Sequence, residues 1–297
     1  METALNHASP RVLAIVVSYN AMRWADRCLG SLLRSSLRPD VLVVDNGSAD
    51  GTREHVASAF PEVRLICNPD NAGFGAANNI GLRIALDEGY DFVYLMNQDA
   101  WVEEDTLSLL VRAHSLAYGV LSPVQNDAAG RMDSRFEHKC GRFLKRAAAA
   151  PGETARVVEL PFVMAAHWLV SREALLATGG FSPAFRQYGE DDNFIDRLHW
   201  HGFLCGVVPS ASAVHDRSGR RLPKEKKMKL KCVAPVVKLS NPGNCLPWRC
   251  VLEVLELAAM SVKNFSLYPL KQLPALLKRL PELKRLRAES RKRGAFL

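Results

Sequence analysis

Apolar residues gather in four short segments within the first hundred residues of the chain. These segments are rich in Val, Ile and Leu, and they span residues 12–20, 41–47, 63–68 and 92–99. Continuous apolar character, rather than alternation, is typical of strands buried on both faces of a parallel sheet. Helix-like segments separate them, at about residues 24–37, 52–60 and 76–88. The alternation predicts βαβ units and an open, Rossmann-like α/β sheet flanked by helices.

Polar side chains close each of these predicted strands. They are Ser18, Tyr19 and Asn20, then Asp45 and Asn46, then Asn68, and finally Asn97, Gln98 and Asp99. Asn and Asp favour turns, which is the plainer explanation at any single position. The presence of polar residues at all four strand ends favours a ligand site, because open α/β sheets bind ligands at the carboxyl ends of their parallel strands.

Later segments of the chain are less regular. Residues 120–160 are mixed and polar, which predicts a mobile excursion rather than part of the core. Residues 157–181 predict an apolar strand, a helix from about Arg172 and a Gly-Gly turn. Residues 187–203 predict a helix with an acidic start, which the helix dipole favours, and an apolar face of Phe194, Leu198 and Phe203.

Gly73 and Gly75 open the third predicted helix and resemble part of a dinucleotide fingerprint. The third glycine position holds Asn78, and the element follows the third strand, so a Rossmann dehydrogenase is disfavoured. The glycines fit a close approach of the backbone to a ligand, or a turn. A sugar-phosphate nucleotidyltransferase would need a Gly-rich phosphate loop with a basic residue after the first strand, which residues 18–28 lack. That class stays an alternative, as does a non-catalytic nucleotide- or sugar-binding module.

Charge is spread unevenly along the 297 residues. The chain carries a net charge of +8, but residues 217–297 hold 20 Lys/Arg against 5 Asp/Glu, a balance of +15. Residues 1–216 carry the remaining −7. A basic segment of this kind fits an anionic partner, either a membrane or a nucleic acid. Its aromatic residues are sparse and it carries no recognised nucleic-acid motif, so we expect no nucleic acid partner.

Residues 251–297 bring leucines and cations together at near-helical spacing. The leucines are 273, 276, 277, 280 and 283, and the cations are Lys278, Arg279, Lys284, Arg285 and Arg287. A basic amphipathic stretch can lie in the headgroup region of an anionic membrane with its apolar face inward. The alternative is a helix packed on the rest of the chain with a solvated basic face.

The expected location is the cytoplasm, peripheral on the inner face of the cell membrane. The seven cysteines lack CxxC spacing and therefore predict reduced thiols. No apolar run approaches the roughly 20 residues that span a bilayer.

Six motifs occur in an order that resembles family 2 glycosyltransferases of the GT-A fold. They are VVSYN, VVDNGSADGT, NPDNAGFGAANNIGL, MNQDA, GEDDNFIDRLHWHGF and VHDRSG. The resemblance covers about residues 10–220 and implies a catalytic domain there, followed by a basic helical extension at residues 221–297. Enzymes of this family transfer a sugar from a nucleotide diphosphate to an acceptor hydroxyl, usually with inversion of the anomeric centre.

The resemblance also implies a class of donor and acceptor. The Asn-x-Asp pattern at Asn97–Asp99 and the general layout are similar to bacterial rhamnosyltransferases and other enzymes that build cell-surface polysaccharides. We therefore expect a UDP- or dTDP-sugar donor, with dTDP-rhamnose favoured, and a glycan or lipid-linked acceptor.

Matched residue by residue, the family's motifs imply a donor site. Tyr19 and Asn20 would line the base and ribose pocket, and Asp45 would bind the uracil or thymine edge. Asn78 would face the donor, and Asn97 is assigned to the donor nucleotide as well.

The same matching implies a metal site and a catalytic base. Asp99 closes the family's metal motif, and His215 matches a histidine that often completes it. Because Asn97 is neutral, we expect Mg²⁺ or Mn²⁺ to bind weakly until the donor supplies phosphate oxygens. Asp191 falls on the family's general base, with Glu190 as the alternative catalyst. Crowding of these two carboxylates with Asp192 is expected to raise their pKa values.

Overall fold

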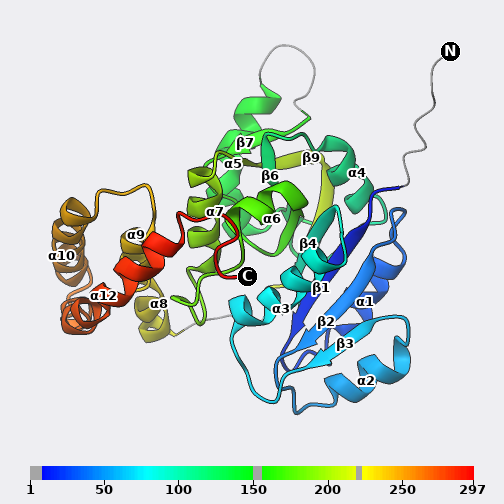
Figure 1. Cartoon of the computed structure of the whole chain (residues 1–297), viewed down its shortest axis with the longest axis horizontal. Helices are drawn as coiled ribbons and strands as arrows, with labels where there is room; N and C mark the ends of the chain where they lie inside the picture. The colour runs from blue at the N-terminus through cyan, green and yellow to red at the C-terminus, as the bar shows by residue number, and fades with distance from the viewer. Residues whose placement is uncertain (1–8, 150–155, 219–222) are drawn as a thin grey trace.

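The computed structural model describes residues 9–149, 156–218 and 223–297. Within these residues the strands form one nine-stranded sheet with helices on both faces, which confirms the predicted α/β architecture (Figure 1). The strand order is β3-β2-β1-β4-β8-β6-β9-β5, and β7 pairs with β9. The predicted domain boundary between residues 220 and 221 lies outside the described residues.

The four predicted strands form the parallel half of the sheet. They are β1 (Val12–Ser18), β2 (Asp40–Asp45), β3 (Arg64–Cys67) and β4 (Phe92–Asn97). The helices between them are α1 (Ala25–Leu33), α2 (Thr52–Ala59) and α3 (Phe74–Asp87). The prediction that residues 63–68 form a buried strand is right about the strand and wrong about its burial. Arg64 and Cys67 are exposed because the sheet ends at β3.

Later segments of the chain supply the other half of the sheet. β8 (His167–Ser171) runs antiparallel to β4, and β6 (Tyr118–Asn126) lies between β8 and β9 (Leu204–His215). The short strands β5 (Ala100–Val102) and β7 (Val158–Leu160) both pair antiparallel with β9. Three helices pack on this half, α4 (Thr106–Ala113), α6 (Arg172–Thr178) and α7 (Glu190–Trp200). The helices predicted from Arg172 and within residues 187–203 are therefore confirmed.

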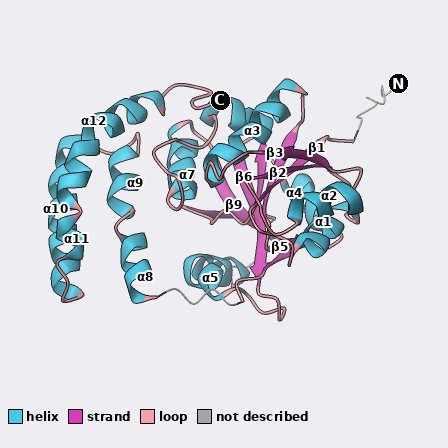
Figure 2. Ribbon diagram, turned by 90° about the horizontal axis from the view of Figure 1, so that it is seen from below, coloured by secondary structure: helices cyan, strands magenta, loops and turns pink. Residues whose placement is uncertain are grey.

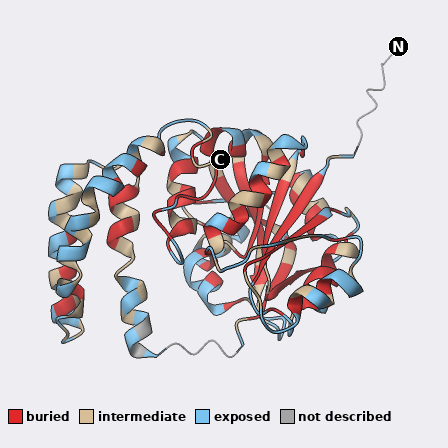
Figure 3. Cartoon of the chain, turned by 60° about the horizontal axis from the view of Figure 1, so that its bottom comes forward, coloured by how far each residue is buried: buried red, intermediate tan, exposed pale blue. Residues whose placement is uncertain are grey.

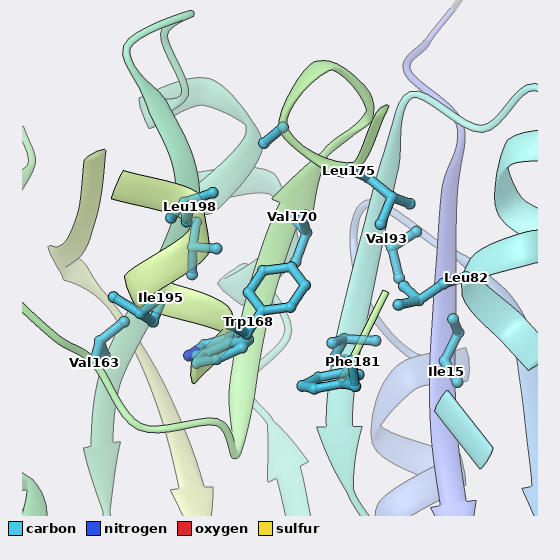
Figure 4. Packing of buried hydrophobic residues seen from close by; sticks show 14 of the residues in the cluster. Ile15, Leu82, Val93, Val163, Trp168, Val170, Leu175, Phe181, Ile195 and Leu198 are labelled. Atoms are coloured by element: carbon cyan, nitrogen blue, oxygen red, sulfur yellow. The ribbon is translucent and has the colours of Figure 1, made fainter. Parts of the chain in front are cut away.

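Side chains of β1 alternate between two hydrophobic cores, which explains why this strand is apolar at every position. Leu13, Ile15 and Val17 join a core with α3, α6 and α7. Val12, Ala14 and Val16 join a second core with α1 and α4. Figure 4 shows the first core, where Ile15 lies near Leu82 and the ring of Trp168 stacks on Phe181 with the centroids 6.5 Å apart.

The prediction of a mobile, non-core excursion at residues 120–160 is wrong for most of that segment. β6 lies inside the sheet, and α5 (Ser134–Ala148) buries Phe136 and Cys140 in the first core. Asp133 caps this helix by accepting hydrogen bonds from the backbone N–H groups of Arg135 and Phe136. The buried positions are four residues apart on one face, and the charged residues around them lie on the outward face and hide the pattern.

The C-terminal extension is helical and lies to one side of the sheet (Figures 1 and 2). It contains α8 (Lys224–Lys231), α9 (Ala234–Ser240), α10 (Leu246–Lys263), α11 (Tyr268–Lys271) and α12 (Leu273–Glu289). In the part of the chain that the structure describes, no helix is long and apolar enough to cross a membrane.

The leucine stripe of α12 faces protein, so the predicted membrane face does not form there. Leu283 is buried, and Leu276 and Leu280 pack against the same cluster. That cluster includes Ala184 and Phe185 of the preceding domain as well as residues of α9. Leu277 is the exception among the stripe, at 56% exposed. The packed-helix alternative therefore describes α12.

The last residues of the chain tie the extension to the sheet domain. Gly180 donates its N–H to the carbonyl of Ala295 at 2.8 Å, and Gly294 donates to the carbonyl of Ala177 at 3.1 Å. Gly179 has a φ of +77°, and a Cβ there would lie 1.9 Å from the Ala295 oxygen, so no larger residue fits. The extension is thus held by the α12 packing and by this backbone pairing.

Candidate active site

A cavity of about 1590 Å³ lies at the carboxyl ends of the parallel strands. Six of the predicted site residues line it, namely Tyr19, Asn97, Asp99, Glu190, Asp191 and His215. Asn20, Asp45 and Asn78 are absent from its lining. The cavity thus joins the end of β4, the end of β9 and the acidic start of α7, which are far apart in the sequence.

Asp99 and His215 meet because β5 pairs with β9. The pairing sets Ala100 opposite His215, and Asp216 donates its N–H to the carbonyl of Asp99 at 2.8 Å. His215 Nε2 lies 3.4 Å from Asp99 Oδ1 and 3.5 Å from Asn97 Nδ2. Both Asp99 and His215 are buried, at 1% and 2% exposed. The expected meeting of these two residues is present in the structure.

The donor set fits a divalent cation that also binds the phosphates of a ligand. In the described part of the chain, no group of three His, Cys, Asp or Glu side chains could hold a metal on its own. Asp99 offers carboxylate oxygen, the kind of ligand that Mg²⁺ and Mn²⁺ prefer. Arg217 donates from Nε to His215 Nδ1 at 3.2 Å, which leaves the proton of a neutral imidazole on Nε2. His215 can therefore bind a cation only after this hydrogen bond is broken.

The acidic start of α7 carries carboxylates of raised basicity. Burial raises the pKa of Glu190 to about 7, and the charge of Asp191 adds to the rise. Burial likewise raises the pKa of Asp192 to about 7, again with a contribution from Asp191. The predicted direction is confirmed, but burial rather than like-charge crowding is the main cause. Glu190 Oε2 has no hydrogen-bond partner among the described residues.

Asp191 is held in place while its pKa is raised. Its Oδ1 accepts a hydrogen bond from the backbone N–H of Asp192 at 2.9 Å. Burial raises the pKa of Asp191, whereas backbone hydrogen bonds from Asp192 and Ala165 and the charge of Lys139 oppose the rise. The carboxylate is therefore more basic than an ordinary Asp, and the charge of Lys139 acts on it.

Asp45 lies behind the cavity wall, within a closed set of hydrogen bonds. Its carboxylate accepts from the hydroxyls of Ser18 at 2.9 Å and Ser48 at 2.5 Å, and from Arg53 Nε at 2.6 Å. Burial alone would raise the pKa of Asp45, but the hydrogen bonds from Ser48 and Arg53 outweigh it and hold the pKa below its usual range. Its contact with a base edge stays a prediction.

Asn20 and Asn78 also bind neighbouring backbone. Asn20 has a left-handed φ of 51°, and its Oδ1 accepts from the N–H of Ala49 at 2.9 Å. Asn78 is buried, and its Nδ2 donates to the carbonyl of Phe74 at 2.9 Å. In this structure Asn20 joins the loops after β1 and β2, whereas Asn78 bonds within the first turn of α3, and their contact with a donor stays a prediction.

The loop before α3 is fastened to the end of β2 by Asn46. Its Nδ2 donates to Asn71 Oδ1 at 3.1 Å, and its Oδ1 accepts from Asn68 Nδ2 at 3.1 Å. Gly73 has a φ of +93°, and a Cβ there would lie 2.5 Å from the Arg186 carbonyl oxygen. The close approach that the glycine allows is therefore to the protein's own backbone. Asn46, Asn71 and Gly73 all line the cavity.

Basic side chains on α5 complete the site and were missed by sequence reasoning. Arg135, His138 and Lys139 line the cavity, and the Nζ of Lys139 lies 5.0 Å from the ring centroid of Phe162. The four-residue spacing of Arg135 and Lys139 was the available signal, because these two positions share one helix face. Because residues 120–160 were predicted to be a mobile excursion, these α5 residues were not among the predicted site residues.

Comparison with known proteins agrees with this geometry. Residues 13–175 match the family described as glycosyl transferase family 2. An N-acetylglucosaminyl-diphospho-decaprenol L-rhamnosyltransferase of Mycobacterium tuberculosis is 31% identical over 231 residues, which covers 69% of this chain and 75% of that protein. An undecaprenyl-phosphate mannosyltransferase of Micrococcus luteus is 34% identical over 106 residues, covering 35% of this chain and 44% of that protein.

Solved structures show the same fold. The mannosyltransferase PcManGT of Pyrobaculum calidifontis, in complex with GDP-Man and Mn²⁺, superposes with a TM-score of 0.56 at 22% identity. The match covers 95% of this chain and 85% of that one. S. aureus TarS 1–349 in complex with UDP gives a TM-score of 0.56 at 16% identity, covering 95% and 88% of the two chains. The predicted GT-A architecture is thereby confirmed.

Proposed function

The chain belongs to glycosyl transferase family 2, and from this premise we propose that it transfers a sugar to a lipid-linked acceptor with inversion of the anomeric carbon. The proposed donor is a UDP- or dTDP-sugar, with dTDP-rhamnose favoured, and the proposed pathway builds a bacterial cell-surface polysaccharide. The rhamnosyltransferase name of the Mycobacterium tuberculosis relative supports the sugar and the lipid carrier. The observation that carries the proposal is the single cavity shared by Asn97, Asp99 and the acidic start of α7.

The donor nucleotide is proposed to lie at the strand ends. Tyr19 is exposed at the cavity, and its backbone is fixed by a hydrogen bond from its N–H to Gln98 Oε1 at 2.6 Å. Asn97 also lines the cavity, and its Nδ2 lies 3.5 Å from His215 Nε2. Asp45 reaches the base only by exchanging a present partner such as Ser48, while Asn20 holds the loop after β2 and Asn78 lies in the first turns of α3.

The donor diphosphate is proposed to bring Mg²⁺ or Mn²⁺ to Asp99, with His215 as a second ligand once Arg217 has moved. When bound, such a cation stabilises negative charge on the departing nucleoside diphosphate. Arg135 and Arg217 also line the cavity and add positive charge. These cations support the proposal, because positive charge near the leaving group favours its departure.

Asp191 is proposed as the general base. An acceptor oxygen attacks the anomeric carbon from the side opposite the diphosphate, and the bond from this carbon to the phosphate oxygen breaks. The bonding electrons leave with the nucleoside diphosphate, and the acceptor's proton passes to the Asp191 carboxylate. Attack from the opposite side inverts the configuration. Burial makes Asp191 more basic, and Lys139 keeps a share of it ionised.

A transfer assay over a panel of nucleotide sugars tests this assignment. Asp191→Asn removes the proton acceptor but keeps the shape, so it should bind donor as the wild type does and lose roughly 10²–10⁴-fold in kcat. Glu190→Gln and Asp192→Asn are the matched variants, because both carboxylates are adjacent and have raised pKa values. If either of these loses transfer while Asp191→Asn stays active, the base is misassigned.

The protein is further proposed to sit peripherally on the inner face of the cell membrane, with α10 as its contact. Trp248, Val251, Leu255 and Val262 form one exposed stripe along α10, three to seven residues apart. Phe265, just past the helix, is 98% exposed. Exposed Lys263 and Lys271 flank this end of the stripe.

Figure 3 shows the outermost helices of the extension with much of their surface exposed. An exposed apolar stripe beside cations fits an anionic bilayer surface.

A further inference from the structure

The cavity continues past the acidic start of α7 into the C-terminal extension. Its far wall, which we term the extension wall, is made by side chains of α8, α9, α10 and α12 together with the loop after α8. These are Lys229, Val233, Val236, Leu257, Leu276 and Arg279. Tyr268 and Gln272 add two neutral polar groups at the same end. The donor end and the far end of the cavity therefore come from different parts of the chain.

The two ends differ in chemistry. Among the described residues, the carboxylates that line the cavity are Asp99, Glu190, Asp191 and Asp192, all outside the extension wall. The extension wall is apolar with two cations, Lys229 and Arg279, and Arg279 also donates from Nε to Glu282 Oε2 at 3.2 Å. Such a surface offers few hydrogen-bond partners to a free glycan. It suits a molecule with an anionic group and an apolar chain.

The extension wall is fixed in place rather than loosely attached. Arg279 donates from Nη2 to the carbonyl of Ala184 at 2.9 Å, so the helix that supplies it is joined to the sheet domain. Val236 and Leu276 belong to the cluster that also contains Phe185. The wall is therefore formed before a ligand arrives, which lowers the entropic cost of binding.

Helix α10 connects this wall to the outer surface of the molecule. Leu257, at 1% exposed, points inward and lines the cavity, whereas Leu255, at 59% exposed, lies on the outer stripe. Helix α10 therefore supplies the cavity wall with one face and the exposed stripe with the other.

We propose that the extension wall is the acceptor subsite and binds the diphosphate and first isoprene units of a polyprenyl diphosphate-linked saccharide. Arg279 and Lys229 bind the diphosphate, and Val233, Val236, Leu257 and Leu276 cover the isoprene units. The saccharide hydroxyl then reaches Asp191 from the side opposite the donor. This inference rests on the proposed function and adds the acceptor class and the part of the chain that binds it.

Direct binding tests the inference without knowledge of the saccharide. With UDP and Mn²⁺ saturating, farnesyl diphosphate should bind the full-length protein, and both methyl diphosphate and farnesol should bind at least about tenfold more weakly. Methyl diphosphate lacks the isoprene units, and because each buried CH₂ contributes about fourfold, two or three lost methylenes already produce such a difference. Farnesol lacks the diphosphate and therefore loses the proposed charge-assisted hydrogen bonds to Arg279 and Lys229. Isothermal titration or a fluorescent analogue supplies the dissociation constants.

Substitutions at two neighbouring residues test whether farnesyl diphosphate binds at the extension wall. Leu276→Asp puts a carboxylate into the extension wall and should weaken farnesyl diphosphate binding by at least about tenfold. Leu277→Asp changes the next residue, which is exposed and outside the cavity lining, and should bind as the wild type does. UDP binding should be the same in all three proteins, and thermal melts check that they are folded.

The outcomes separate this inference from the proposed function. Failure of the wild type to bind UDP, dTDP or their sugars would contradict the proposed function itself. Normal nucleotide binding overturns the inference alone in any of three cases: farnesyl diphosphate does not bind, methyl diphosphate binds equally well, or the two Asp variants behave alike.

Discussion

The carboxyl group of Glu190 is buried, and the folded protein therefore favours its protonated form. Its pKa is raised to about 7 from an unfolded value of 4.5, so its contribution to stability is complete below pH 4.5 and is lost as the pH rises through 7. Glu190→Gln stays neutral at every pH. The variant should therefore have a higher free energy of unfolding than the wild type at pH 8, by up to about 3 kcal/mol, and one only about 1 kcal/mol higher at pH 5.

Urea denaturation at the two pH values checks this prediction. Glu256→Gln serves as the control, because Lys238 and Arg249 lower the pKa of Glu256 and its replacement should not stabilise the protein at pH 8. Equal unfolding of the wild type and Glu190→Gln at pH 8 would show that the fold does not disfavour this charge.

At the scale of single residues, the sequence predicted which residues belong to the site better than it predicted what each side chain contacts. Asp99, His215, Asp191 and Glu190 were identified by their place in ordered motifs, and all four line the cavity. Asp45 was expected at the cavity too, yet its carboxylate lies inside a shell of Ser and Arg donors. Residue type and spacing do not report the direction of a side chain at a strand end.

At the scale of elements, the α10 stripe makes a prediction about membranes. The wild type should float with anionic vesicles at low salt, because each surface cation contributes about 1 kcal/mol and the apolar side chains add their burial. A Val262→Glu, Phe265→Glu double variant should reduce the bound fraction by at least about tenfold, since each lost large side chain costs about 1.5–3 kcal/mol.

The control for this flotation is Leu116→Glu, because Leu116 is an exposed apolar residue of the sheet domain. It should float like the wild type. The membrane proposal fails if the double variant floats like the wild type. It also fails if the wild-type protein remains at the bottom of the gradient with anionic vesicles as it does with neutral ones.

The elements that were misread share one physical cause. In α5 the apolar positions are few and charged residues surround them, so the segment looked solvated although Phe136 and Cys140 are in the core. In α12 the leucine stripe was visible, but an amphipathic pattern is the same whether protein or bilayer covers its apolar side. The four parallel strands were read correctly because burial on both faces gives a continuous apolar run.

At the scale of the whole molecule, the site depends on pairings between distant segments. Asp99 meets His215 through the β5–β9 ladder, and the extension wall exists because α9 and α12 pack on Ala184 and Phe185. Spacing along the chain carries no information about such contacts. The order of the motifs was enough to predict the donor and catalytic residues by resemblance to one family. The motifs end near residue 220, however, and the cavity is also lined by residues beyond that point.

The central claim is that this cavity binds a nucleotide diphosphate together with a divalent cation at Asp99. Equilibrium binding of UDP and dTDP, with and without Mn²⁺, tests it in the wild type, in Asp99→Asn and in Asp87→Asn, which alters an exposed carboxylate at the end of α3. We predict that Mn²⁺ tightens binding by at least about tenfold, or 1.4 kcal/mol, in the wild type and Asp87→Asn but not in Asp99→Asn. Equal affinity with and without Mn²⁺ in the wild type, or a full Mn²⁺ effect in Asp99→Asn, would contradict the claim.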